Sequence, residues 1–278
     1  LSSKVESSIF RLGFGTGYRV VNVFTEDHAA LTGARDVIFT EDILPEKSWN
    51  LNFNWNKKIY TKHGTIFDMD FSLFNTVFSN KIIPDYDTNP NQIIYANLDG
   101  KGVTQGATIN LNGLFANGLK IIMGATFIDS KVTSNNTDEY PYLTEKFSAN
   151  YKISYSLFKP EITFDISGTI IGPMKLPLLG DLDTRDPYSP LINIINLQTS
   201  YTFKEIEIYG GIKNILNFKP PSDSIARAFD PFDTNVEFGA NGQIIATPNN
   251  PNALSFDPSY VYYSNQGISG FIGIRYNF

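Results

Sequence analysis

A strict two-residue alternation of apolar and polar side chains most limits how this chain can fold. It is clearest at residues 49–56, where Trp, Leu, Phe and Trp hold the odd positions and Asn holds every even one. A period of two residues indicates a β-strand with one apolar and one polar face. Asparagines do not suit a dry core, because each buried amide would need hydrogen-bond partners. This strand therefore needs an apolar environment on one side and water on the other.

The same alternation recurs in about ten segments, most of them close to the roughly 9–11 residues with which a tilted strand spans a bilayer. Trp49, Leu51, Ile153 and their row are expected to face lipid, and the Asn row an aqueous lumen. The expected strands are 10–18, 49–56, 67–73, 107–112, 121–127, 147–157, 162–167, 195–203, 206–213 and 267–278.

The last segment, 267–278, ends on Phe278 with no polar tail after it. A soluble edge strand of this kind invites aggregation, whereas a strand whose apolar face meets lipid does not. A buried strand of a soluble β-sandwich explains this segment equally well when it is taken alone. The connections between the strands distinguish a membrane barrel from a soluble sandwich.

Short and long connections alternate along the chain. A sandwich has no reason to sort its loops in this way, whereas outer-membrane barrels have short periplasmic turns and long extracellular loops. The sequence therefore predicts an all-β fold: a transmembrane antiparallel β-barrel segment of about ten strands. The short links are 61–64, 117–118, 159–160 and 204–205, and the long ones are 19–47, 84–102, 132–146, 172–191 and 215–266.

The amino-acid composition restricts the classes of function and structure that this chain can have. The net charge is −6 without a basic stripe, which argues against nucleic-acid binding. The absence of cysteine excludes disulfides and thiolate metal sites. The apolar runs are far too short for a membrane helix of roughly 20 residues. Because the chain starts at Leu1 without an apolar leader, we expect a processed chain or a fragment.

Four motifs, in this order, resemble the TonB-dependent outer-membrane receptors. They are GTGYRVVNVF from Gly15, LPEKSWN from Leu44, YGGIKNILN from Tyr209 and the terminal RYNF from Arg275. Members of that family have 22 strands around an N-terminal plug domain. The resemblance implies that residues 1–278 are the last ten strands of such a barrel. The plug and the TonB-contacting segment would then lie outside this chain, and the first and last strands would be unpaired within it.

The resemblance also implies a function. The protein would be an active-transport receptor of the bacterial outer membrane that takes up a scarce nutrient, such as a ferric siderophore or another metal chelate. Its partners would be outer-membrane lipid, the chelate and the TonB complex, which supplies the energy. Neither a cofactor nor an enzymatic activity is expected. The alternatives are a passive porin-like channel and a ten-stranded outer-membrane protease, for which only His28 and His63 could serve as catalytic histidines.

The longest loop, 215–266, is the candidate ligand surface, because aromatic rings and an arginine suit an aromatic, anionic metal chelate. The alternative is that its last tyrosines belong to an interfacial aromatic girdle. The candidate ligand-contacting residues are Arg227, Phe229, Phe232, Phe256, Tyr260, Tyr262 and Tyr263.

Three acidic loops are candidates for calcium binding, although a solvated loop is the ordinary alternative. The first begins with the alternating oxygen ligands of a calcium loop, but Pro90 stands where the turn glycine belongs. We assign no metal ligands. The acidic groups are Asp85, Asp87 and Asn89; Asp181, Asp183 and Asp186; and Asp230 and Asp233.

Overall fold

The computed structural model describes most of the chain. Within the described ranges every helix or strand element is a β-strand. No helix in that part of the chain is long and apolar enough to cross a membrane. The described residues are 2–5, 8–20, 36–39, 43–85, 88–89, 92–134, 137–176, 186–221, 237–240, 244–251 and 262–276.

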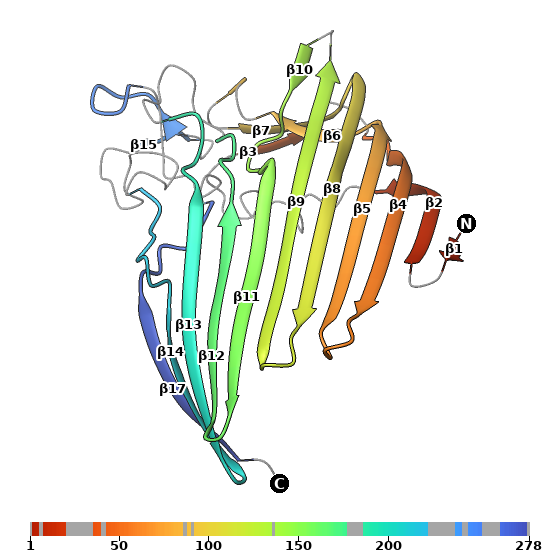
Figure 1. Ribbon diagram of the computed structural model, residues 1–278. Coiled ribbons are helices and arrows are strands. Elements are labelled where there is room, and N and C mark those ends of the chain that lie inside the picture. Colours follow the sequence, from red (N-terminus) through yellow and green to blue (C-terminus); the bar gives the residue numbers. More distant parts are fainter. Residues whose placement is uncertain are drawn as a thin grey trace.

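One curved antiparallel sheet forms the wall of the molecule (Figure 1). Its order is β1-β2-β4-β5-β8-β9-β11-β12-β13-β14-β17, and β10 (Thr137–Glu139) pairs with β9 off this path. The strands are β1 (Ser2–Val5), β2 (Ser8–Arg19), β4 (Glu46–Tyr60), β5 (Ile66–Ser79), β8 (Gly100–Leu114), β9 (Leu119–Ser134), β11 (Phe147–Phe158), β12 (Glu161–Ile171), β13 (Ile192–Phe203), β14 (Ile206–Lys213) and β17 (Ser269–Tyr276).

The ten predicted strands are all present, and the fold class is confirmed. Several run further toward the loops than the alternation indicated: β8 begins at Gly100 and β9 ends at Ser134. The backbone ladder continues there because its hydrogen bonds do not depend on side-chain polarity. The last strand is shorter than predicted and is described from Ser269 to Tyr276.

The sheet is open among the described residues. No ladder joins β17 to β2, as predicted, and β17 pairs with β14 alone. The prediction that the first strand is unpaired is wrong at its beginning, because β1 pairs with Ser8 to Arg11 of β2. Among the described strands, β2 pairs with β1 on this edge and with β4 on the other.

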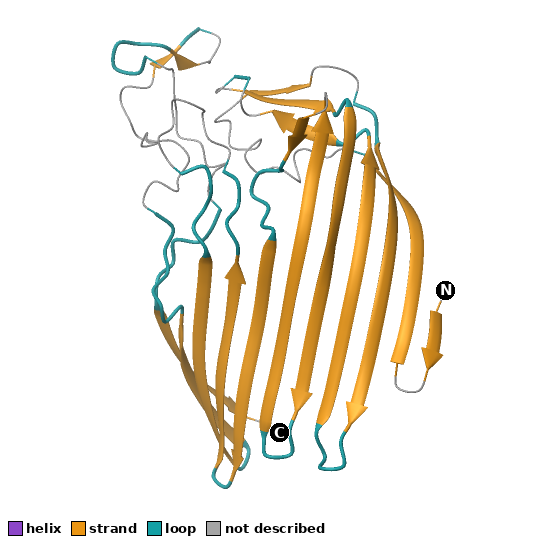
Figure 2. Ribbon diagram, turned by 45° about the horizontal axis from the view of Figure 1, so that its top comes forward, coloured by secondary structure: helices purple, strands orange, loops and turns teal. Residues whose placement is uncertain are grey.

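The turns all lie at one end of the wall and the long connections at the other (Figure 2). The four predicted short turns are present, and the β8–β9 turn shows how tight they are. Gly118 has a φ of +86°, and a Cβ there would lie 2.3 Å from the carbonyl oxygen of Ser156. Only glycine fits this position, because a side chain would be strained and would strike the neighbouring backbone.

The long connections contain strands that the sequence analysis did not predict. β3 (Asp36–Phe39), β7 (Gln92–Asn97) and β6 (Ile82–Asp85) form a second sheet in that order. β15 (Glu237–Phe238) and β16 (Ile244–Ile245) form a small hairpin in the longest one. The second sheet forms because its short apolar runs bury one another. Its core consists of Ile82, Ile93 and Tyr95, with Val37 and Ile43 against it.

The register of the wall places polar and apolar residues on separate faces, which confirms the predicted alternation. One row across four strands reads Asn50, Thr76, Thr104 and Ser130. A row on the other face, three residues further along β4, reads Phe53, Leu73, Ala107, Phe127 and Phe147.

The polar face satisfies itself by hydrogen bonds between strands. Asn50 donates to Thr76 at 2.6 Å, and Thr104 and Ser130 share a hydrogen bond of 2.9 Å. The apolar face is uncovered in the described structure: Leu51 is 43% exposed and Ile153 38%. An apolar surface of this extent needs an apolar surrounding.

Spin labels test this assignment of faces, since the chain contains no cysteine. Labels at Leu51→Cys and Ile153→Cys should be reached by oxygen, which concentrates in lipid. Labels at the adjacent Asn52→Cys and Lys152→Cys should not, because their side chains project from the opposite face. The measurement is collision with oxygen and with a water-soluble nickel chelate, in the full-length protein reconstituted into vesicles. Equal oxygen access within each adjacent pair would contradict the assignment.

Candidate functional site

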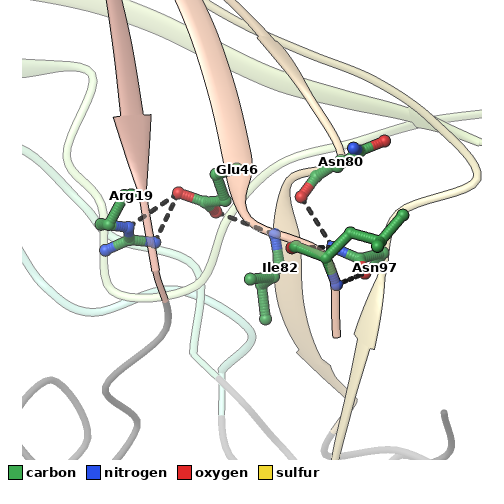
Figure 3. Close-up of polar contacts among 6 residues, drawn as sticks. Arg19, Glu46, Asn80, Ile82 and Asn97 are labelled. Atoms are coloured by element: carbon green, nitrogen blue, oxygen red, sulfur yellow. Dashed lines mark hydrogen bonds and ion pairs between the residues drawn. The ribbon is translucent and has the colours of Figure 1, made fainter. Parts of the chain in front are cut away.

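A buried carboxylate anchors the second sheet to the wall at its loop end. Glu46, on the polar face, is 5% exposed and stands opposite Arg19 in the β2–β4 register. Arg19 donates from Nε at 2.8 Å, and its Nη2 lies 2.7 Å from the same oxygen, Oε2. The other oxygen, Oε1, accepts the backbone N–H of Ile82 at 2.8 Å (Figure 3). One side chain thus joins two wall strands to the first residue of β6.

Asn97 completes the attachment from β7 (Figure 3). Its amide nitrogen donates to the carbonyl oxygens of Leu44 at 3.0 Å and Asn80 at 2.8 Å. Its amide oxygen accepts the N–H of Leu44 at 2.7 Å. Both long connections on this side of the wall are therefore fixed together. We call β3, β6 and β7 the mouth lobe.

Lys81 lies beside this anchor, directly before β6. Burial lowers the pKa of its ammonium group below the ordinary value; the Glu46 carboxylate opposes this and Arg19 adds to it. The aliphatic part of Lys81 fills space left by Gly102, where a Cβ would lie 2.8 Å from Lys81 Cδ. The charged group is thus held partly out of water next to a bidentate ion pair.

Two further connections are joined by backbone hydrogen bonds at the same end of the wall. The N–H of Leu143 donates to the carbonyl of Lys175 at 2.8 Å. The N–H of Leu176 donates to Pro187 at 2.9 Å, and that of Ser189 to Met174 at 2.8 Å. The connection between β9 and β11 is therefore joined to the connection between β12 and β13, and together they form one unit.

This unit roofs a cavity of about 330 Å³, which we call the mouth pocket. Ile128 and Ser130 of β9 form part of its lining, and Ser130 belongs to the polar row of the wall. The pocket therefore borders the polar face, and Phe147 of the apolar row also belongs to its lining. The joined connections contribute, among others, Tyr140, Glu145, Lys146, Lys175 and Tyr188.

The lysines of the pocket lie over aromatic rings. Lys146 Nζ is 3.8 Å from the ring centroid of Tyr140, and Lys175 Nζ is 4.5 Å from that of Tyr142. Such contacts attract a cation but leave its N–H donors available. The arrangement can accept an anionic group beside flat apolar surfaces.

Of the predicted ligand residues, Tyr262 and Tyr263 are described, and neither lines this pocket. Tyr263 packs edge-on against Phe218, with ring centroids 5.8 Å apart and planes at 84°. Tyr262 is half-buried beside it in the chain. Whether this loop contacts cargo stays a prediction. Arg227, Phe229, Phe232, Phe256 and Tyr260 lie outside the described residues.

Sequence reasoning missed the residues of the mouth pocket. They come from two connections that are separated by two wall strands in the chain. The available signal was local: tyrosine and lysine occur together in YPYLTEK, from Tyr140 to Lys146. Nothing in the sequence shows that Lys175 and Tyr188 meet this segment, because loop pairing leaves no periodic pattern.

Calcium binding also stays a prediction. Asp85 Oδ1 accepts the N–H of Thr88 at 2.9 Å, and the carbonyl of Asn89 accepts Gln92 N–H at 3.0 Å. The described part of the chain contains no group of three or more acidic, histidine or cysteine side chains that could hold a metal. Asp186 is described, whereas Asp87, Asp181, Asp183, Asp230 and Asp233 are not.

Comparison with known families agrees with the geometry of the wall. Residues 6–215 match the family described as TonB dependent receptor-like, beta-barrel. The chain belongs to the TonB-dependent receptor β-barrel family. The match covers the strands from β2 to β14. No curated protein sequence matches the chain.

The chain is similar in fold to solved structures whose names describe transporters and receptors. They include the copper transporter OprC (12% identity), the FrpB iron transporter from Neisseria meningitidis (10%) and FpvA from P. aeruginosa bound to heterologous pyoverdines (11%). Each has a TM-score of 0.62 and covers 99% of this chain. At these identities the likeness establishes the fold. The chain spans 38%, 38% and 32% of the length of those chains.

The anchor predicts the effect of Glu46→Gln. The variant keeps the shape but loses the charge on a buried acceptor, so local stability of the mouth lobe should fall by about 1–3 kcal/mol. Hydrogen exchange of residues 80–98, followed by mass spectrometry, should accelerate accordingly. Asp138→Asn is the control, because its ion pair with Lys131 is exposed and contributes about 1 kcal/mol or less. Unchanged exchange in Glu46→Gln would exclude Glu46 as the anchor.

The lowered pKa of Lys81 predicts how folding stability should change with pH. Its folded pKa lies below its unfolded value, so between the two pKa values the unfolded chain binds more protons and rising pH favours folding. The native protein should therefore gain stability relative to Lys81→Met as pH rises from neutral toward about 10.5, the ordinary lysine pKa. Denaturant titrations of both proteins at several pH values measure this difference. A difference that moves the opposite way contradicts the assigned burial.

Proposed function

We propose that the full-length receptor takes up a scarce metal chelate across the bacterial outer membrane, using energy from the TonB complex. The observation that carries this proposal is the match of residues 6–215 to the TonB-dependent receptor barrel. In such receptors the barrel forms the wall of the transport path and presents loops that collect the cargo.

The two faces of the wall support a location in the outer membrane. A row such as Phe53, Leu73, Ala107, Phe127 and Phe147 would meet lipid, while asparagine, serine and threonine hydrogen-bond one another on the opposite face. Backbone N–H and C=O groups in lipid must pair internally, as they do along the ladders of this sheet. A polar inner face suits a water-filled path.

Transport rather than catalysis is the activity that the polar face supports. Several of its charges form ion pairs between neighbouring strands, such as Lys152 with Asp165 at 3.1 Å and Arg275 with Glu207 at 2.6 Å. Paired charges of this kind stabilise a wall. His63 lies in a short turn, and His28 is outside the described residues.

A metal chelate is the cargo class that two further observations support. The structural neighbours include iron and copper transporters and siderophore receptors. The mouth pocket also offers two lysines, and metal chelates of biological origin commonly carry negative charge. The proposed cargo is therefore an anionic chelate of iron or another transition metal.

Uptake measurements test the proposal. We expect a bacterium with the full-length gene to accumulate radiolabelled iron or copper from chelates, and to lose this accumulation when either the receptor or TonB is deleted. Binding to whole cells should persist in the TonB deletion, because capture precedes the energised step. Uptake that continues without TonB would instead identify a passive channel.

A further inference from the structure

We propose that the mouth pocket binds a small monoanionic aromatic acid, presented either as the free acid or as one arm of a larger chelate. This inference deepens the proposed function and rests on it, in that the pocket opens toward the route of the cargo. It concerns a binding step that needs neither TonB nor energy, so it can be tested separately.

The pocket is placed where cargo would pass. Ser130 shares a hydrogen bond with Thr104 on the polar face, and Ile128 is in register with Gly106 of the same face. The two joined connections close the pocket on the loop side. A ligand can therefore reach the pocket along the polar face or from the mouth.

The walls of the pocket suit an aromatic ring. Tyr140 and Tyr188 contribute rings, and Pro141 and Pro173 contribute flat apolar surfaces. Tyr188 is 51% exposed, so surface remains on which a ligand can stack. A volume of about 330 Å³ lies at the small end of the range for ligand sites, which favours a single ring over a whole chelate.

Among the described residues, the two pocket lysines have no anionic partner. Neither Lys146 nor Lys175 forms an ion pair with any described residue, since both ammonium groups lie over tyrosine rings instead. A ring face neutralises a cation less than a carboxylate does. An incoming carboxylate can therefore accept hydrogen bonds from one or both ammonium groups without displacing an existing partner.

Glu145 determines which ligand charge the pocket favours. Its side chain belongs to the same lining and forms no ion pair with the described residues. Two ammonium groups and one carboxylate leave a net charge of +1 in the lining. A single carboxylate balances this charge, whereas a second one would meet the like charge of Glu145. The geometry therefore favours a monoanion over a dianion or a neutral ring.

Binding of benzoate to the purified full-length receptor, in detergent and without TonB, tests the site. Calorimetry or saturation-transfer NMR measures affinity for benzoate, for cyclohexanecarboxylate (charge without an aromatic ring) and for benzamide (ring without charge). We expect benzoate to bind most tightly. Phthalate, with two carboxylates, should bind more weakly than benzoate.

Three variants should change benzoate binding, two of them weakening it and one strengthening it, and a fourth is the control. Lys146→Met and Lys175→Met should each weaken benzoate binding about tenfold, the effect of one charge-assisted hydrogen bond. Glu145→Gln should strengthen it severalfold, because it removes the like charge and keeps the side-chain shape. Lys101→Met is the matched control: this exposed lysine lies at the same end of the wall, on β8, and outside the pocket. It should leave binding unchanged.

The outcomes separate the alternatives. No benzoate binding, or weaker binding in Glu145→Gln, would overturn the proposal even if a lysine variant failed to fold. Competition between benzoate and an aryl-bearing iron chelate, but not a chelate without aromatic rings, identifies the arm of a larger cargo as the source. Absence of competition with both identifies a free acid. Benzoate binding together with TonB-independent uptake would refute the proposed function while leaving this site intact.

Discussion

The antiparallel ladder is the constraint on which the rest of this structure depends. Because side chains alternate along each strand, the pairing register decides which face every residue occupies. A slip of one residue between β4 and β5 would bring Asn52 to the face of Leu51, and it would separate Asn50 from Thr76 and Asn54 from Ser72. The asparagine bonds and the apolar rows thus select the same register.

The backbone ladder ends differently at the two ends of the wall. At the turn end each pair of strands closes within a few residues, and a glycine such as Gly118 permits the reversal where no side chain would fit. At the loop end the chain leaves the ladder with backbone groups and apolar residues still to be satisfied. These groups are satisfied because the connections pair with one another. β3 pairs in parallel with β7, and Lys175 accepts from Leu143. Glu46 then fixes one such unit to the wall through a charge-assisted bond to Ile82.

The sequence predicted what is periodic and missed what is not. Ten strands, four turns and the polar face could be read from alternation, because each is set by residues adjacent in the chain. The mouth lobe was missed because Val37, Ile82 and Ile93 occur in runs too short to show a period and are brought together only by pairing between separate connections. The mouth pocket was missed for the same reason: Lys146 and Tyr188 share a cavity only after β12 returns the chain to the mouth. The candidate residues of the longest loop were selected by composition alone, and composition does not determine which loop lines a cavity.

The mouth pocket carries a positive charge although the whole chain is acidic. The whole sequence carries −6, and several carboxylates on the wall pair with cations, as Asp165 does with Lys152. In the mouth pocket Lys146 and Lys175 lie over tyrosine rings and form no ion pair with a described residue. A ring holds an ammonium group in position while leaving most of its charge uncompensated. An acidic protein can in this way present a positive site to an anion, because the field inside a partly closed pocket depends chiefly on the nearest groups.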